Sequence, residues 1–97
     1  MISEDVAKVC KCLSDLNRVK ILEFLVKGES CACDILEELS IQQSTLSYHM
    51  KLLSECNLVN VRDSGKWTYY SINCETFKRF KNYLNGLNCA LSHKEIM

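Results

Sequence analysis

Hydrophobic residues recur at intervals of three and four positions along the first half of the chain, and this spacing predicts amphipathic helices. Four such stretches follow one another before residue 57. Gly28 ends the second, since a glycine is common just past the end of a helix. The fourth follows residues 40–43, and Ser44 or a neighbour can cap its start. The inward positions of the four helices are Val6, Val9, Cys10, Leu13 and Leu16; Val19, Leu22, Leu25 and Val26; Ile35, Leu36 and Leu39; and Leu46, Met50 and Leu53.

The pattern changes period at Leu58. Residues 58–62 and 67–72 are rich in β-branched and aromatic side chains, which is typical of strands. They flank a turn in which Gly65 can adopt a positive φ, so a β-hairpin is expected. A final helix follows, and its apolar stripe consists of Phe77, Phe80, Leu84, Leu87 and Leu91.

Two short helices separated by a turn and followed at once by a hairpin predict a winged helix-turn-helix. The helix-turn-helix is expected at about residues 31–56 and the wing at about residues 58–72. We therefore expect a mainly α protein with a β-hairpin wing. A chain of 97 residues fits one domain, residues 1–97.

The outward face of the fourth helix is polar. Its hydroxyl, amide and imidazole groups suit the phosphates and base edges of a DNA major groove. The hairpin adds two cations for an adjacent backbone or minor groove. A polar helix face is often only solvated, but a hairpin directly after it favours DNA binding. The candidate DNA-binding residues are Gln43, Ser44, Thr45, Ser47, Tyr48, His49 and Lys51 on the helix, and Arg62 and Lys66 on the hairpin.

Charge permits DNA binding without demanding it. The formal net charge is zero, but residues 1–39 sum to −3 and the remaining chain to +3. The N-terminus is acidic and lacks the apolar stretch of a signal peptide. No run of about 18 apolar residues is present, so we expect a cytoplasmic protein with no membrane partner.

Seven cysteines in 97 residues are unusual for a chain without a secretory signal, and they indicate metal binding or redox chemistry. Cys31, Cys33 and Asp34 form a C-x-C-D motif. On a regular helix residues i and i+2 point about 200° apart, so two sulfurs at this spacing cannot reach one ion. Chelation requires the helix to begin late or to unwind here. A ligand that distorts this helix would also shift the recognition helix docked on it.

Several segments resemble the ArsR/SmtB family of metal-sensing repressors, and the resemblance covers roughly residues 5–75. The most specific part runs from Ser44 to Leu53. The matching segments are Leu13-Ser14-Asp15-Leu16-Asn17-Arg18, Gln43-Ser44-Thr45-Leu46-Ser47-Tyr48-His49-Met50-Lys51-Leu52-Leu53 and Gly65-Lys66-Trp67-Thr68-Tyr69-Tyr70.

Members of this family are homodimers that bind operator DNA and leave it when a metal or metalloid binds. The resemblance implies that Ser47 and His49 lie on the recognition helix. It also implies that the terminal helices form the dimer interface, and that Cys31 and Cys33 belong to the metal-binding box. The expected function is that of a metal-responsive repressor rather than an enzyme.

Thiolates favour soft ions, so As(III) or Sb(III) is the expected inducer, with Cd(II), Pb(II) or Zn(II) as alternatives. The arsenic-sensing members often carry a third cysteine where this chain has Leu36. A third thiol must come from elsewhere, or the pair acts alone. Cys10 and Cys12 resemble the N-terminal cysteines of the cadmium/lead branch, although core packing explains Cys10 equally well. The other cysteines are Cys56, expected to be structural, Cys74 and Cys89.

Three other hypotheses for the function of the cysteines stay open. The same fold can sense an oxidant or a persulfide through a disulfide, which needs two Cα atoms within about 7 Å. Cys10, Cys12, Cys31 and Cys33 can form a closed structural zinc site, although C-x-x-C is the usual spacing for that. A thiol enzyme is the least favoured, because a Cys-His pair with an orienting third residue is missing.

Overall fold

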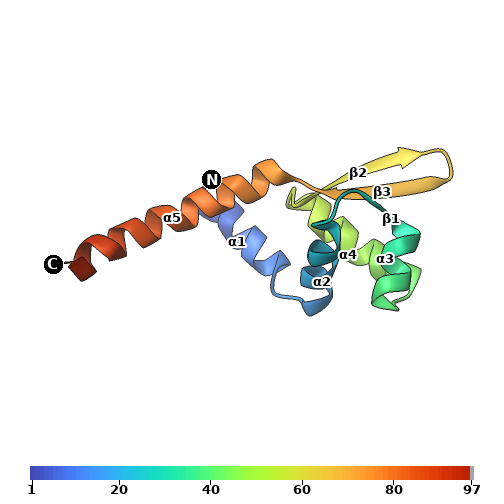
Figure 1. Cartoon of the computed structure of the whole chain (residues 1–97), viewed down its shortest axis with the longest axis horizontal. Helices are drawn as coiled ribbons and strands as arrows, with labels where there is room; N and C mark the ends of the chain where they lie inside the picture. The colour runs from blue at the N-terminus through green and yellow to red at the C-terminus, as the bar shows by residue number, and fades with distance from the viewer. Residues whose placement is uncertain (97) are drawn as a thin grey trace.

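The computed structural model describes the backbone of residues 1–96 and the side chains of residues 1–88. Figure 1 shows α2, α3 and α4 gathered beneath the hairpin at one end, with α1 on the side toward α5 and α5 extending away as a long arm. The expected mainly α fold with a β-hairpin wing is confirmed. The elements in chain order are α1 (Ser3–Cys12), α2 (Leu16–Leu25), β1 (Ser30–Cys31), α3 (Ala32–Leu39), α4 (Gln43–Glu55), β2 (Val59–Ser64), β3 (Trp67–Ile72) and α5 (Cys74–Ile96).

Local residue chemistry sets the helix ends. The Asp15 carboxylate accepts a hydrogen bond from the backbone N–H of Arg18 at 3.2 Å and so caps α2. Ser40 closes α3 in the left-handed conformation, with φ of 53°. Ser44 does not cap α4, because the helix already begins at Gln43. Gln42 holds the N-cap position without a side-chain hydrogen bond.

The sheet has three strands in the order β1-β3-β2, and all pairs are antiparallel. The hairpin was expected, but β1 was not. Ser30 pairs with Tyr70 and Cys31 with Tyr69. A strand of two residues is too short to show an alternating pattern, so sequence periodicity cannot reveal it. As a result, the first cysteine of the C-x-C motif belongs to the same sheet as the wing.

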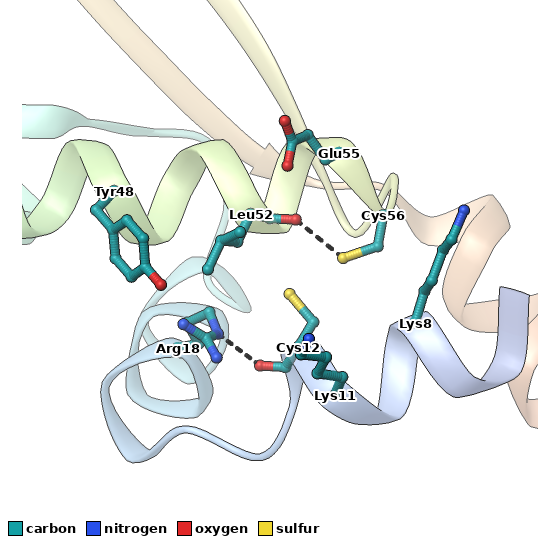
Figure 2. A pocket seen from close by; sticks show the side chains of 8 residues that line it. All are labelled: Lys8, Lys11, Cys12, Arg18, Tyr48, Leu52, Glu55 and Cys56. Atoms are coloured by element: carbon teal, nitrogen blue, oxygen red, sulfur yellow. Dashed lines mark hydrogen bonds between the residues drawn. The ribbon is translucent and has the colours of Figure 1, made fainter.

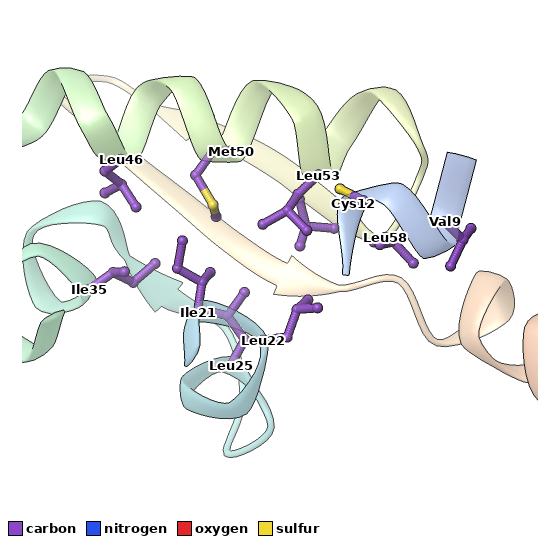
Figure 3. Close-up of a cluster of buried hydrophobic side chains, with 11 residues drawn as sticks. Val9, Cys12, Ile21, Leu22, Leu25, Ile35, Leu46, Met50, Leu53 and Leu58 are labelled. Carbon is purple, nitrogen blue, oxygen red and sulfur yellow. The ribbon is translucent and has the colours of Figure 1, made fainter. Parts of the chain in front are cut away.

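The hydrophobic core lies between α1, α2, α3, α4 and the start of β2 (Figure 3). Three residues expected to face inward are instead exposed. Cys10 points to solvent because Val9 and Cys12, three residues apart, form the buried side of α1. Leu16 begins α2 and Val26 lies just past its end, so neither has a helix neighbour to cover it. The fully buried side chains are Val9, Ile21, Leu25, Ile35, Leu53 and Leu58.

The final helix contributes to the core only at its beginning. Phe77 and Phe80 pack against the buried cluster. Leu84 and Leu87, further along the same stripe, are 45% and 53% exposed. Leu91 and Cys89 lie outside the residues whose side chains are described. Among the described residues no helix is both long and apolar enough to cross a membrane.

Candidate DNA-binding and thiol sites

Helix α4 presents a polar surface at its N-terminal half. Thr45 is half-buried there, and Tyr48, at 59% exposure, is the largest side chain of this face. The other expected DNA-binding residues of the helix are all exposed: Gln43, Ser44, Ser47 and Lys51. Of the expected DNA-binding residues on α4, all but one therefore have at least part of the side chain exposed.

The exception is His49, because the expectation that it faces outward is wrong. Its side chain is buried, with the residue 6% exposed. The Nη1 of Arg18 lies 3.1 Å from His49 Nδ1, and since a guanidinium only donates, Nδ1 accepts. The other ring nitrogen, Nε2, lies 3.9 Å from an Asp15 carboxylate oxygen. His49 thus links α4 to the start of α2, and its ring is not part of the exposed face of the helix.

The position of His49 follows from helix geometry. Leu46, Met50 and Leu53 form the buried stripe of α4, and position 49 lies three residues after the first of them. Its partners are Asp15, the N-cap of α2, and Arg18, in the first turn of α2, and only tertiary packing brings them to His49. A polar residue beside an apolar stripe needs such partners when it is buried.

The two cations of the wing differ in their surroundings. Lys66 lies at the exposed turn between β2 and β3. Arg62 lies within β2, and two of its nitrogens donate to the Glu29 carboxylate at 2.8 and 3.1 Å. The guanidinium also lies 4.5 Å from the ring centre of Tyr69. The hydrogen bonds from Arg62 hold the pKa of Glu29 below its ordinary value.

The C-x-C motif has the local geometry that chelation requires. Cys31 is extended, with φ of −70° and ψ of 146°, and α3 begins one residue later. The late helix start brings the Sγ atoms of Cys31 and Cys33 to 2.7 Å. The hydrogen bond to Cys31 raises the pKa of the exposed Cys33 thiol. Of the two alternatives that the spacing left open, a late start and an unwound turn, the chain adopts the first.

Of the other cysteines, those whose side chains the structure describes do not join this pair. Cys10 and Cys74 are exposed, whereas Cys12 is buried and faces the half-buried Cys56 across a cavity (Figure 2). Residues 1–88 contain no group of three or more His, Cys, Asp or Glu side chains placed to hold a metal ion. A third ligand for Cys31 from this described part of one chain is therefore not in place. No sequence signal pointed to the meeting of Cys12 and Cys56, because they are distant along the chain.

A polar recognition helix docked on a shorter helix and followed by a charged hairpin defines a winged helix-turn-helix regulator that binds DNA. Comparison with known proteins agrees with this class. The family model described as "Bacterial regulatory protein, arsR family" matches residues 15–61. The chain belongs to the ArsR family, and within it is a transcriptional repressor and not an enzyme.

Three similar proteins represent the matches. An arsenical resistance operon repressor of Staphylococcus xylosus is 41% identical over 88% of this chain and 78% of its own length. A cadmium resistance regulatory protein CadC homolog of Staphylococcus aureus is 42% identical over 77% of this chain and 63% of its own. A homodimeric winged helix-turn-helix DNA-binding domain of Mycobacterium bovis is 27% identical over 93% of this chain and 84% of its own, with a TM-score of 0.72.

Proposed function

We propose that this repressor binds operator DNA as a homodimer and is released when a thiophilic ion binds Cys31 and Cys33. The observation that carries the proposal is the 2.7 Å approach of the two sulfurs at the start of α3. Thiolate ligands suit As(III) and Sb(III) first, and Cd(II), Pb(II) or Zn(II) next. The arsenical resistance operon repressor and the cadmium resistance regulatory protein among the relatives support this ion class.

In this proposal the exposed face of α4 and Lys66 on the wing contact the operator DNA. Short polar side chains read base edges and phosphates, while a lysine contributes charge that neutralises phosphate. His49 has a different part in this proposal, because it positions α4 through Arg18. Since operator DNA is the partner, we place the protein in the cytoplasm.

The homodimer is supported by the part of the apolar stripe on α5 that the core of this chain does not cover. Leu84 and Leu87 are exposed, and the exposed Ile2 adds apolar surface at the other terminus. Exposed leucines on one helix face favour burial against a second copy. The homodimeric structure from M. bovis has the same fold. Leu84→Glu should yield a monomer in sedimentation and weaken operator binding, whereas a persistent dimer would place the interface elsewhere.

The structure offers two connections from the cysteines to the DNA-binding surface. Cys33 lies in the first turn of α3, the helix that precedes α4 in the helix-turn-helix. Cys31 pairs with Tyr69, whose ring lies beneath Arg62. An ion that draws the two sulfurs into its own geometry acts on α3 and on the wing sheet together. A coupling of about 1–3 kcal/mol would weaken operator binding about 5–150-fold.

The test is operator release titrated with As(III), Sb(III), Cd(II), Pb(II), Zn(II) and peroxide. We expect release by at least one soft ion in the parent protein and none in the Cys31→Ser, Cys33→Ser double variant, with unchanged affinity for ion-free DNA. Cys74→Ser is the matched control, because Cys74 is an exposed cysteine away from the motif. If the double variant leaves operator DNA at the same ion concentration as the parent, the ion binds at other residues. If only peroxide releases the parent protein, the thiol-redox hypothesis is favoured.

A further inference from the structure

A second pair of thiols lies between the first helix and the recognition helix. Cys12 is the last residue of α1, and Cys56 follows directly after α4. Figure 2 shows their sulfurs turned toward each other at a cavity of about 400 Å³. Cys12 is 5% exposed, and the Cys56 thiol donates to the carbonyl of Leu52 at 3.0 Å. The pair is therefore enclosed by protein on the Cys12 side and reached from solvent on the Cys56 side.

The cavity around this pair carries a surplus of positive charge. Lys8, Lys11 and Arg18 line it, against the single carboxylate of Glu55. The Nε of Arg18 donates to the backbone carbonyl of Cys12 at 2.7 Å, which holds the guanidinium close to the thiol. A surplus of cations beside two thiols favours a ligand complex with net negative charge.

We propose that Cys12 and Cys56 bind one two-coordinate, monovalent soft ion of the Cu(I) class, independently of Cys31 and Cys33. Two S–H protons leave, two Cu–S bonds form, and the resulting bis-thiolate complex has a net charge of −1. Arg18, held beside Cys12 by its bond to the Cys12 carbonyl, compensates that charge, and Lys8 and Lys11 line the same cavity. As(III) binds three sulfurs and fits this pair poorly, because the described residues offer no third ligand of that kind here.

The surroundings of Cys12 bear on how it would bind an ion. Burial, with the hydrogen-bonded Cys56 next to it, raises the pKa of Cys12 to about 12, and Arg18 opposes only part of this effect. A soft cation can still displace the proton, because metal–thiolate bonds form with proton release. The bound ion would join the end of α1 to the end of the recognition helix.

The experiment uses the full chain with serine at Cys10, Cys31, Cys33, Cys74 and Cys89, so that only the proposed pair remains. The variant is titrated anaerobically with Cu(I) against a chromophoric Cu(I) chelator. We expect one equivalent bound, with two sulfur neighbours in X-ray absorption. Adding Cys12→Ser or Cys56→Ser should abolish this binding. A variant that binds no Cu(I), or binds it equally well after either substitution, overturns the proposal.

A second comparison does not depend on the folding of a multiple variant. In the otherwise unchanged protein, Cys12→Ser should remove one bound equivalent of Cu(I) and its stabilising effect on thermal unfolding. Cys10→Ser, an exposed cysteine on the same helix, should remove neither. Equal Cu(I) stoichiometry in the two variants would overturn the proposal. Operator release by the ions tested above should persist in Cys56→Ser, so failure here is distinguishable from failure of the proposed function.

Discussion

Cys31 and Cys33 lie two residues apart at the edge of the wing sheet, whereas Cys12 and Cys56 lie 44 residues apart and meet between two helices. The first pair is brought together by one local event, the start of α3 after Cys31. The second is brought together only by the packing of α1 against the end of α4. The comparison shows that one chain can create thiol pairs by local backbone geometry and by tertiary packing. Pairs of the second kind are invisible to motif searches.

The largest expected effect is the pH dependence of Cu(I) binding by the second pair, Cys12 and Cys56. Each bound thiol loses its proton, so apparent affinity rises with pH by up to about tenfold per proton and pH unit until the thiol pKa is passed. The Cys12 pKa of about 12 lies above the ordinary value of 9.0. Cu(I) binding by Cys12 and Cys56 should therefore keep strengthening above pH 9. The measurement is competition titration from pH 6 to 10, and a plateau below pH 9 would contradict it.

The next largest effect concerns the buried contact that holds α4 in place. His49→Ala removes a buried ring and leaves Arg18 without its partner on α4, so we expect a loss of about 3 kcal/mol in the free energy of unfolding. Urea titration measures it. The matched control is Ser47→Ala, an exposed change on the same helix, which should leave stability within about 0.5 kcal/mol while weakening operator binding. If His49→Ala is as stable as the parent, the contact with Arg18 does not fasten the helix.

A smaller effect separates two cysteines of the same helix. Cys12→Ser places a hydroxyl in the core and should lower the free energy of unfolding by about 1–2 kcal/mol. Cys10→Ser lies on the exposed side of α1 and should change it by less than about 0.5 kcal/mol. Thermal melts of the reduced proteins check this, since about 1 kcal/mol shifts the midpoint by about 4–8 °C in a domain of this size. Equal melting temperatures would contradict the burial of Cys12.

The smallest expected effect lies at the edge of the sheet. Glu29→Gln removes the negative charge opposite Arg62 and leaves the guanidinium available to a DNA phosphate. Operator affinity at low salt should rise modestly, and the slope of its salt dependence should steepen by about one phosphate contact. Glu23→Gln, an exposed change on α2, is the control. A salt dependence identical to that of the parent would show that Arg62 does not reach DNA once it is freed.

Much of this fold could be predicted because its elements are long and periodic. Helix α4 and the hairpin each carry a clear pattern, and the glycine at the turn marks its place. The strand β1 could not be predicted, since two residues have no period and only their partners on β3 define them. For the same reason Glu29 and Arg62, 33 residues apart, give no sign in the sequence of the ion pair that they form.

The candidate sites, too, could be predicted only in part from the sequence. The late start of α3 was one of two geometries that the spacing of Cys31 and Cys33 allowed, and physical reasoning about helix phase reached it. The burial of His49 was missed because histidine suits both a DNA-binding face and a buried network. Its partners on α2 decide between the two, and they are fixed by tertiary packing.

The shortness of β1 also bears on the dynamics of the molecule. A strand of two residues at a sheet edge has few hydrogen bonds to lose, so it can open by itself while α2 and α4 stay folded. Amide hydrogens of residues 29–33 should accordingly exchange with solvent much earlier than those of the helices that form the core. An incoming ion would then meet a segment that is already sampling open conformations. The free-energy cost of rearranging the cysteines is thereby limited to the loss of a few backbone hydrogen bonds. The rest of the domain continues to unfold as one cooperative unit.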